Sequence, residues 1–419
     1  MRLAVVSPFV DRRHGTERAL AELLERLARR YHCQIHLYSQ RVEDIVLDHP
    51  DAPQDAGAGA IWWHRVPSVG GPHLLQFVGW MAANTFLRWY YGLFRSTSCD
   101  LVLSPGINCL NADVILVHAL FHRLRELGRE ETNDATAVAG FYLRLHRRVY
   151  YRLLAALERR VYSDRNVSLA AVSERTADLL GQYFLRRDVR VVPHGVDTGQ
   201  FSGSERLARR PEARRRRNFR DSDCVLLLIG NDWRVKGVPA ILAAMAAAPA
   251  LPWRLLVAGS DARGPFREMA KHLGLLDRCQ WEPPRRDVLD LYAAADIYVS
   301  PSQEDSFGLP VAEAMACGLP VITSVCAGVS GLIHDGVDGF VLRDPQDARA
   351  LAALLERLHV DEILQSTVGR AAARAVQEWT WDRHAAALWE LLNDALAKKR
   401  NSGTSETGAM ASSRAGPAT

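Results

Sequence analysis

The residues best suited to chemistry are two carboxylates, Asp305 and Glu313, with seven residues between them in the segment 300–323. Gly308 lies between the two acids and lets a backbone approach a ligand closely. A helix that begins after this glycine aims its free N–H groups and partial positive charge at an anion such as a phosphate. A carboxylate repels a phosphate but accepts hydrogen bonds from sugar hydroxyls. Two acids around an amide cradle are therefore what a sugar joined to a phosphate needs. The alternative is an ordinary strand-to-helix turn with Glu313 as a surface charge.

The elements that must position these residues follow from the same segment. The pattern predicts a buried strand that ends at Ser300, a polar loop over 302–309 and a helix over 311–316. Gly318 can adopt the left-handed conformation that ends a helix, and Pro320 prevents its continuation. A second strand is expected directly afterwards, so the segment predicts a strand–loop–helix–strand unit.

The stretch PVAEAMACGLPVI, residues 310–322, carries a resemblance to a known family. Together with the two acids it resembles the acid-x7-acid signature of the family 4 glycosyltransferases, retaining enzymes of the GT-B architecture. This chain has Asp305 where the first acid is normally Glu, and Glu304 stands just before it. The resemblance implies an α/β protein with two Rossmann-like domains that face each other across a cleft. It also implies a nucleotide-sugar donor on the second domain and an acceptor on the first.

The loop GNDWRVKG, residues 230–237, is similar to the family loop that places a basic residue and a Lys-Gly pair on the donor diphosphate. The resemblance assigns Lys236 to the lysine position and Arg234 to the other position, with Asn231 as the alternative. Fixed cations beside a departing nucleoside diphosphate stabilise its growing charge without a metal ion. The resemblance implies a UDP- or GDP-sugar as the donor substrate, and because of the fixed cations we expect neither a metal nor another cofactor.

Further roles in the key segment are implied by the same resemblance. Glu313 is expected to hold the ribose hydroxyls and Asp305 the hydroxyls of the transferred sugar. The donor phosphate and sugar are expected to meet the backbone amides of Phe307, Gly308 and Leu309.

The segment ADVILVHALFHRL, residues 112–124, resembles the family segment in which a histidine follows a strand and faces the transferred sugar. A residue at the C-terminal end of a parallel strand points into the ligand crevice, which favours His118. His122, four residues further on, is the alternative. The expected role is contact with the sugar or assistance at the reacting centre.

The N-terminal strand and the loop that follows it open a nucleotide-type α/β domain. Family members usually carry two glycines in this loop near the donor diphosphate, whereas this chain has His14 and Gly15. Gly15 still allows close approach of a backbone to the donor. His14 is either a ligand residue or a solvated loop residue.

The domain boundary is expected in VVPHGVDTGQF, residues 191–201, which resembles the interdomain segment of the family. This predicts an acceptor-side domain over 1–195 and a nucleotide-sugar-binding domain over 196–379. A terminal helix over 380–397 is expected to cross back to the first domain. Residues 401–419 are rich in Ser, Gly, Ala and Thr, which predicts a disordered tail.

Composition sets wider limits on function. A length of 419 residues is enough for two domains, and a net charge of +4 suits an anionic substrate or a membrane surface rather than a nucleic acid. The seven cysteines show no C-x-x-C pair or metal-ligand spacing, which favours a reduced cytoplasm. The first residues, MRLAVVSPF, indicate a strand rather than a signal peptide. The expected location is the cytoplasm, with peripheral contact to the inner face of the cytoplasmic membrane left open.

Two segments raise the question of membrane contact. Residues 74–94 are long and apolar, and predict either a helix packed on the sheet or an interfacial helix with aromatic anchors. Residues 141–162 predict a basic amphipathic helix that suits anionic lipid or an acidic acceptor, or else presents a solvated face. A glycan or lipid-linked acceptor is compatible with both interpretations.

The arginine-rich run over 206–220 shows no apolar pattern and predicts an exposed linker or loop. Asp221 and Asp223 form a D-x-D triplet, which holds a metal in other glycosyltransferases, but the triplet precedes a strand instead of ending one. We therefore expect no metal there.

Two other functions stay open: a nucleotide-sugar epimerase and a non-catalytic subunit that binds nucleotide sugars. Donor turnover with and without an acceptor separates all three functions.

Overall fold

The structure is a computed structural model that describes residues 1–12, 15–48, 59–94, 98–134, 141–285 and 287–413. For residues 128–134, 141–147 and 402–413 it describes the backbone alone. The chain divides into two compact units. Unit 1 consists of Met1–Val172, Thr176–Val192 and His384–Thr419, and unit 2 of Ser173–Arg175 and Pro193–Arg383. The sequence places the main boundary after residue 195, and the division lies after Val192.

Unit 1 is built on a parallel sheet with the strand order β5-β3-β1-β6-β7-β8-β9 in the described part of the chain. The strands are β1 (Arg2–Val6), β3 (Gln34–Ser39), β5 (Ala60–Arg65), β6 (Leu101–Pro105), β7 (Val114–Val117), β8 (Ser168–Ala171) and β9 (Arg190–Val191). A short pair, β2 (Phe9–Val10) and β4 (Arg41–Val42), lies beside it. The central strands read as continuous apolar runs because helices cover both faces of the sheet.

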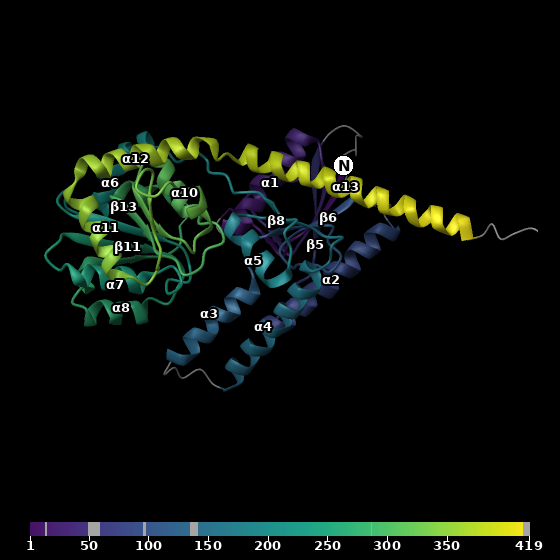
Figure 1. The fold of residues 1–419 in the computed structure, drawn as a ribbon, viewed down its shortest axis with the longest axis horizontal. Helices are drawn as coiled ribbons and strands as arrows, with labels where there is room; N and C mark the ends of the chain where they lie inside the picture. The colour runs from purple at the N-terminus through teal and green to yellow at the C-terminus, as the bar shows by residue number, and fades with distance from the viewer. Residues whose placement is uncertain (13–14, 49–58, 95–97, 135–140, 286, 414–419) are drawn as a thin grey trace, which may run out of the picture. The chain divides into compact units, whose positions relative to one another are not determined.

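The helices of unit 1 include α1 (Gly15–Tyr31), α2 (His73–Phe94), α3 (Phe121–Asp134), α4 (Phe141–Tyr162), most of α5 (Glu174–Phe184) and most of α13 (Trp381–Ser413). In α1 the leucines at positions 20, 23, 24 and 27 form one buried stripe, as expected for a helix packed on a sheet. Helices α3 and α4 lie side by side and extend beyond the strands of the unit (Figure 1).

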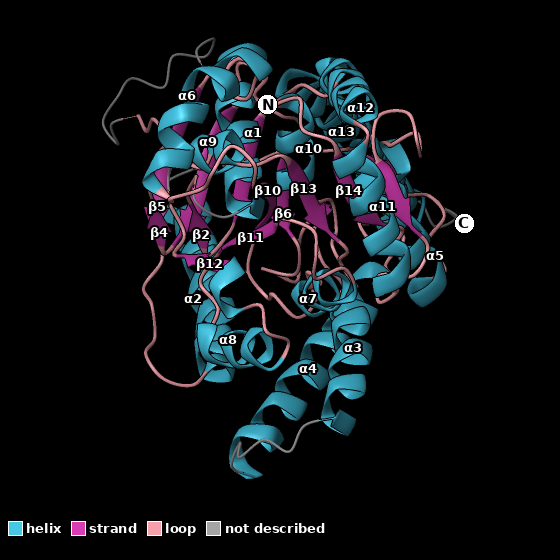
Figure 2. Ribbon diagram, turned by 90° about the vertical axis from the view of Figure 1, so that its left-hand side faces the viewer, coloured by secondary structure: helices cyan, strands magenta, loops and turns pink. Residues whose placement is uncertain are grey.

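Unit 2 contains a second parallel sheet, with the order β12-β11-β10-β13-β14-β15 among the described residues. Its strands are β10 (Cys224–Ile229), β11 (Trp253–Ala258), β12 (Cys279–Glu282), β13 (Ile297–Ser300), β14 (Val321–Ser324) and β15 (Phe340–Leu342). Its helices are α6 (Gly203–Arg216), α7 (Val238–Ala247), α8 (Arg263–His272), α9 (Leu289–Ala294), α10 (Leu309–Ala316), α11 (Ala348–Val360) and α12 (Glu362–Ala375), with short 3-10 turns that include η2 (Gly328–Leu332). Figure 2 distinguishes these helices and strands by colour.

The strand order of unit 2 reverses between β10 and β13, which are direct neighbours. The chain runs outward from β10 to β12 on one side and from β13 to β15 on the other. In open parallel sheets, ligands bind at such a reversal, outside the carboxyl ends of the strands. The loops 230–237 and 301–308 follow β10 and β13, so the fold brings the two loops with candidate residues together.

The structure departs from the sequence-based expectations at two places. The prediction of an exposed linker over 206–220 is wrong, because most of this run lies in α6, whose N-cap Ser202 accepts a hydrogen bond from the Glu205 amide at 3.3 Å. Helix α13 continues to Ser413, where composition predicted disorder from residue 401. An established helix extends more easily than a new one forms, and composition alone does not take this into account. Residues 414–419 lie outside the described residues.

Candidate functional site

The backbone of the β13–α10 loop is fixed at both ends. The hydroxyl of Ser324, on β14, donates to the carbonyl of Ser302 at 2.5 Å. At the other end, Gly308 is the N-cap of α10 with φ of 97°, a left-handed conformation that favours glycine. Pro310 occupies the first turn of α10, as the sequence predicts.

The segment around η2 braces the middle of the same loop. The Asp305 amide donates to the carbonyl of Cys326 at 3.1 Å, and the Gly328 amide donates to the carbonyl of Asp305 at 2.8 Å. A Cβ atom at Gly328 would lie 2.1 Å from the carbonyl oxygen of Ser306, so only glycine allows this approach. The backbone of Asp305 is therefore held on both sides, and this fixes the position from which its side chain extends.

Lys236, from the loop after β10, meets that carboxylate. Its Nζ atom lies 2.5 Å from Oδ2 of Asp305, and the two side chains are 20% and 16% exposed. The two loops also touch through their backbones: a Cβ atom at Gly237 would lie 2.4 Å from the carbonyl oxygen of Pro301. Gly237 itself has φ of 92° and caps α7. The strand reversal thus joins a cation and an anion that are distant in sequence.

The two adjacent acids of the loop have different partners. The carboxylate of Glu304 pairs with Arg175 at 3.0 Å, whereas Asp305 pairs with Lys236. The Ser173 hydroxyl donates to the carbonyl of Ser306 at 2.7 Å and supports the same segment. The geometry thus distinguishes Asp305 from Glu304, although their order in the sequence leaves the first acid ambiguous.

Glu313 lies in the second turn of α10 and is 4% exposed. Its carboxylate accepts a hydrogen bond from the Tyr292 hydroxyl at 2.7 Å. Burial, together with the nearby Glu313 charge, raises the pKa of Tyr292 well above its ordinary value, so the hydroxyl remains a donor. Glu313 is therefore an oriented, buried acid and not the solvated surface charge of the alternative interpretation.

The N-terminus of α10 presents backbone donors between the two acids. Leu309 is its first residue, Gly308 is its N-cap, and Phe307 directly precedes that cap. Amides at the start of a helix have no intrahelical acceptor and carry the positive end of the helix dipole. The three predicted amides therefore lie at a position that favours an anion.

The loop after β10 offers a second cation. Arg234 is exposed, whereas the Asn231 side chain accepts hydrogen bonds from the amide and hydroxyl of Ser260 at 2.9 and 2.8 Å. Both residues are exposed, but of the two alternatives for the second position only Arg234 carries a positive charge. The D-x-D triplet serves a structural purpose: the buried Asp223 pairs with Arg254 at 3.3 Å. Among the described residues, no group of three or more His, Cys, Asp or Glu is arranged to hold a metal ion.

The two candidate histidines of unit 1 differ in their surroundings. His118 directly follows β7 and is 8% exposed; burial, followed by the nearby His384, lowers its pKa to about 3. Its imidazole is therefore neutral at physiological pH. The ring of His122 lies 2.6 Å from the fully buried carboxylate of Glu158, which also accepts the Phe121 and His122 amides at the start of α3. His122 is thus engaged in holding α3.

Gly15 is the first residue of α1, so its amide lies at a helix N-terminus. The residue is exposed. His14 lies outside the described residues.

Sequence reasoning missed Tyr292 and Arg175. A tyrosine in the apolar helix α9 looks like a core residue, and Arg175 lies far from Glu304 along the chain. Only the fold brings these residues to the acids.

Comparisons with known proteins identify the family and the fold of the chain. The family model "Glycosyltransferase Family 4" matches residues 13–200, and the model "Glycosyl transferases group 1" matches residues 209–375. A D-inositol 3-phosphate glycosyltransferase from Salinispora arenicola is 32% identical over 257 residues, which cover 57% of each chain. Another from Geodermatophilus obscurus is 34% identical over 281 residues, which cover 62% of this chain and 58% of that one. The chain thus spans less than two thirds of the length of these relatives.

Solved structures with the same fold extend over nearly the whole chain. WaaG, a glycosyltransferase involved in lipopolysaccharide biosynthesis, has a TM-score of 0.72 at 21% identity and covers 92% of this chain and 98% of its own. Sucrose-phosphate synthase from Thermosynechococcus elongatus has a TM-score of 0.71 at 20% identity, with 94% and 99% covered. Anabaena HepE in complex with UDP and glucose has a TM-score of 0.65 at 17% identity, with 94% and 100% covered. These likenesses show the GT-B fold.

The two family models together match residues 13–200 and 209–375, and the acid-x7-acid segment lies within the second range. Its two acids, Asp305 and Glu313, flank the N-terminus of α10 at the strand reversal. The chain belongs to family 4 of the glycosyltransferases.

Proposed function

We propose that this protein transfers a sugar from a nucleotide-sugar donor to a hydroxyl group of an acceptor, with retention of configuration at the anomeric carbon. The observation that carries the proposal is the contact of Lys236 with Asp305 at the strand reversal of unit 2, beside the N-terminus of α10. A cation, a carboxylate and free helix amides within one pair of loops match the chemistry of a sugar diphosphate.

The diphosphate end of the donor binds Lys236, Arg234 and the first amides of α10. Breaking the bond between the sugar and the diphosphate increases the negative charge on the leaving group. Cations and amides that the fold already holds in place stabilise this charge without reorganising. The reaction therefore needs no metal ion, and fixed positive groups perform the function of one.

The Lys236–Asp305 pair changes partners when the donor arrives. A phosphate oxygen competes with Asp305 for the ammonium group, since both are anionic acceptors. Asp305 then accepts hydrogen bonds from the hydroxyls of the transferred sugar, whereas Glu313, oriented by Tyr292, accepts those of the ribose. The neutral imidazole of His118 contacts the transferred sugar, where it donates or accepts one hydrogen bond.

The acceptor is a sugar or polyol hydroxyl, free or as part of a glycan, glycolipid or other cell-envelope molecule. Support comes from the relatives described as D-inositol 3-phosphate glycosyltransferases, with 31–34% identity in four examples. A phosphorylated inositol is therefore the first acceptor to test, followed by lipid-linked sugars. UDP- and GDP-sugars are the donors to screen, because the described residues do not distinguish the bases.

The experiment measures release of the nucleoside diphosphate from each donor, with and without acceptor, in the presence of EDTA. We expect acceptor-dependent release that chelation leaves unchanged. Asp305→Asn should abolish most of it, while the matched variant Glu304→Gln, at the neighbouring acid paired with Arg175, should keep more activity. Activity that EDTA removes and Mg²⁺ or Mn²⁺ restores would contradict the metal-free mechanism.

Other outcomes separate the alternative functions. Conversion of the donor sugar to its epimer without any acceptor would identify an epimerase. Tight donor binding with no turnover across the acceptor panel would favour a non-catalytic binding subunit. Full activity of a folded Asp305→Asn variant would overturn the proposed role of the β13–α10 loop.

A further inference from the structure

Helix α2 has two apolar faces, of which the inner one packs on unit 1. Trp80 and Asn84 are buried on this face, at 3% and 0% exposure. The Trp80 indole N–H donates to the carbonyl of Asn108 at 2.9 Å, and the Asn84 amide donates to the carbonyl of Trp80 at 2.7 Å. The inner face accounts for the packed-helix interpretation of this segment.

The outer face of α2 is a stripe of large apolar side chains in solvent. Its members are spaced by three, eight, three and four residues, which keeps them on one side of the helix, and each is at least half exposed: Leu75 57%, Val78 50%, Phe86 60%, Trp89 58% and Leu93 60%. Such a regular stripe is the apolar half of an amphipathic pattern, but it faces away from the core. A contiguous exposed apolar patch of this kind marks an interaction surface.

The outer face also lacks charge. Helix α2 contains no Asp, Glu or Lys, and its single arginine, Arg88, turns inward. The Arg88 guanidinium donates to the side-chain oxygens of Asn84 and Asn111 at 3.3 and 2.6 Å. A solvated helix face normally carries charged residues, so simple exposure to water does not explain this one.

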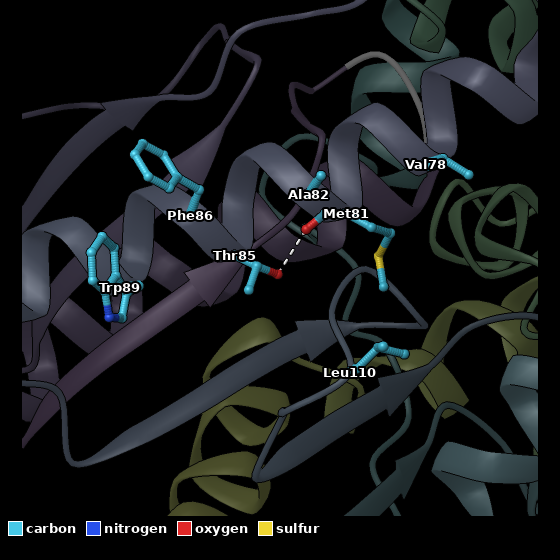
Figure 3. A pocket seen from close by; sticks show the side chains of 7 residues that line it. All are labelled: Val78, Met81, Ala82, Thr85, Phe86, Trp89 and Leu110. Atoms are coloured by element: carbon cyan, nitrogen blue, oxygen red, sulfur yellow. Dashed lines mark hydrogen bonds between the residues drawn. The ribbon is translucent and has the colours of Figure 1, made fainter.

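A shallow apolar hollow of about 590 Å³ lies along this face (Figure 3). Its lining consists of Val78, Met81, Ala82, Thr85, Phe86 and Trp89 from α2, and Leu110 from the segment after β6. The Thr85 hydroxyl donates to the carbonyl of Met81 at 2.7 Å, so its hydrogen is used within the helix. The hollow therefore offers hydrocarbon-like surface with few polar contacts.

The neighbouring helix α4 adds positive charge to the same part of unit 1. Tyr150 of α4 contacts the rings of His73 and Phe77 of α2, with centroids 6.5 and 6.4 Å apart. Four arginines of α4 are exposed, one before Tyr150 and three after it: Arg148, Arg152, Arg159 and Arg160. Within the described part of the chain, their guanidinium groups form no ion pair. Their charge is therefore available to an external anion.

We propose that the outer face of α2 docks on an anionic bilayer, with α2 lying in the plane of the membrane interface and the α4 arginines near the lipid phosphates. No helix among the described residues is long and apolar enough to cross a membrane. Trp89 and Tyr90, 58% and 40% exposed, are of the types that prefer the boundary between hydrocarbon and water. Apolar insertion combined with basic side chains is how interfacial helices bind anionic lipid.

A second copy of the chain is a less suitable occupant of this surface. A symmetric pair that used the same face twice would also bring the α4 helices of both copies to the interface. Their arginines would then repel each other, whereas a bilayer with anionic headgroups would attract them. Charge complementarity therefore favours lipid.

The first experiment is flotation of the full chain with phosphatidylcholine vesicles, with and without phosphatidylglycerol, in the absence of any sugar donor. We expect binding that needs the anionic lipid and declines as salt rises. The double variant Phe86→Ser, Trp89→Ser should bind at least about tenfold more weakly, because it removes two of the largest inserted side chains. The matched control Val360→Ser, Ile363→Ser changes two residues of unit 2 that are 73% and 80% exposed, and should bind normally.

Arg152→Gln with Arg159→Gln tests the electrostatic half of the proposal. Each change should weaken binding to anionic vesicles by about fivefold at low salt, and the double variant should show a smaller salt dependence. Both positions are exposed, so the variants should fold normally. Binding unaffected by these changes would overturn the assignment of α4.

A third measurement places Trp89 in the bilayer. Vesicles with brominated acyl chains should quench part of the tryptophan fluorescence, and Trp89→Phe should lose that quenching while it continues to bind. The proposal is overturned if the full chain does not bind anionic vesicles at low salt. It is also overturned if light scattering shows a dimer that Phe86→Ser, Trp89→Ser dissolves, with no vesicle binding by either form.

Discussion

Helices α6 and α4 are both rich in arginine, but their side chains have opposite environments. In α6, Arg210 and Arg214 pair with one carboxylate, that of Asp296, at 2.5 and 3.0 Å. Just beyond α6, Arg217 pairs with Glu282 and Asp290 at 2.6 and 2.9 Å. In α4, the arginines at 148, 152, 159 and 160 are exposed and form no ion pair with the described residues.

The partners of its side chains, rather than its arginine content, decide what a basic helix does. Arg214 and Arg217 are each 5% exposed at the side chain, and carboxylates from distant segments make this burial tolerable. The α6 arginines therefore help to hold unit 2 together. The α4 arginines have no such partners among the described residues, which leaves their charge for binding.

The largest effect is expected from breaking a pair in α6. Arg214→Ala should lower the free energy of unfolding of unit 2 by about 3–5 kcal/mol, because it removes a buried charged partner and leaves the largely buried carboxylate of Asp296, 17% exposed, with Arg210 alone. It also removes the donor to the carbonyls of Ala294 and Asp223, at 3.1 and 2.8 Å. Guanidinium chloride unfolding, followed by tryptophan fluorescence, measures the change.

The matched control is Arg215→Ala in the next position of the same helix. Arg215 is 79% exposed and pairs only within the helix, with Glu212. Its loss should cost no more than about 1 kcal/mol, as is usual for surface pairs. Equal stability of the two variants would show that the Asp296 pair does not hold α6 in place.

The same contrast explains how far the sequence could predict the structure. The β13–α10 segment is locally consistent: apolar strand, Gly308, Pro310 and Gly318 all favour one arrangement, and the structure confirms the strand, the loop and the helix. The GT-B fold was likewise predictable, because the matching segments extend over most of the chain. Local signals that agree with one another make a prediction reliable.

The features that the sequence could not predict depend on long-range pairing. Arg214 meets Asp296 across 82 positions, and Arg175 meets Glu304 across 129. No local pattern encodes such a contact, so the arginine run looked solvated and the choice between Glu304 and Asp305 stayed open. In α2, by contrast, apolar residues all round the helix left two interpretations open: the buried Trp80 confirms packing on one face, and the interfacial interpretation of the exposed face stays a prediction.

Lys236 is intermediate between the paired arginines of α6 and the exposed arginines of α4, since its partner should change from Asp305 to a phosphate when the donor binds. Lys236→Ala should lower kcat by about 10²–10³-fold, because it removes a fixed positive group beside the leaving diphosphate. Donor affinity should fall less than kcat, since the charge grows in the transition state. Steady-state rates together with calorimetry on the free nucleoside diphosphate separate the two effects. Should donor affinity fall while kcat stays unchanged, Lys236 acts in binding alone.

Glu313 tests a buried charge that has a neutral partner instead of a cation. Glu313→Gln should weaken binding of the donor and of the free nucleoside diphosphate alike, by about 1.5–3 kcal/mol, if the carboxylate holds the ribose. Tyr292→Phe removes the hydroxyl that donates to the Glu313 carboxylate at 2.7 Å. It should weaken binding of the same two ligands by about 0.5–1.5 kcal/mol. Asp305→Asn should instead weaken the intact donor more than the diphosphate. Identical patterns for the two acids would exclude the proposed division of roles.

The last prediction concerns buried bases that cannot both keep a charge. His36 Nδ1 lies 2.9 Å from His64 Nε2 in unit 1, and a hydrogen bond between two imidazoles needs one of these nitrogens without a proton. Burial, followed by a nearby positive group, lowers the pKa of each ring to about 4. Their folded pKa values lie below the unfolded value of about 6.5, so the stabilising effect is complete above pH 6.5 and is lost as pH falls toward 4. Each histidine should contribute at most about 1.4 kcal/mol per pH unit to this loss.

His64→Gln keeps a hydrogen-bonding group but cannot titrate. The slope of the free energy of unfolding against pH should therefore decrease by the contribution of up to one proton, which is about 1.4 kcal/mol per pH unit. Urea unfolding at a series of pH values measures it, and an unchanged slope would show that the pair does not titrate on unfolding.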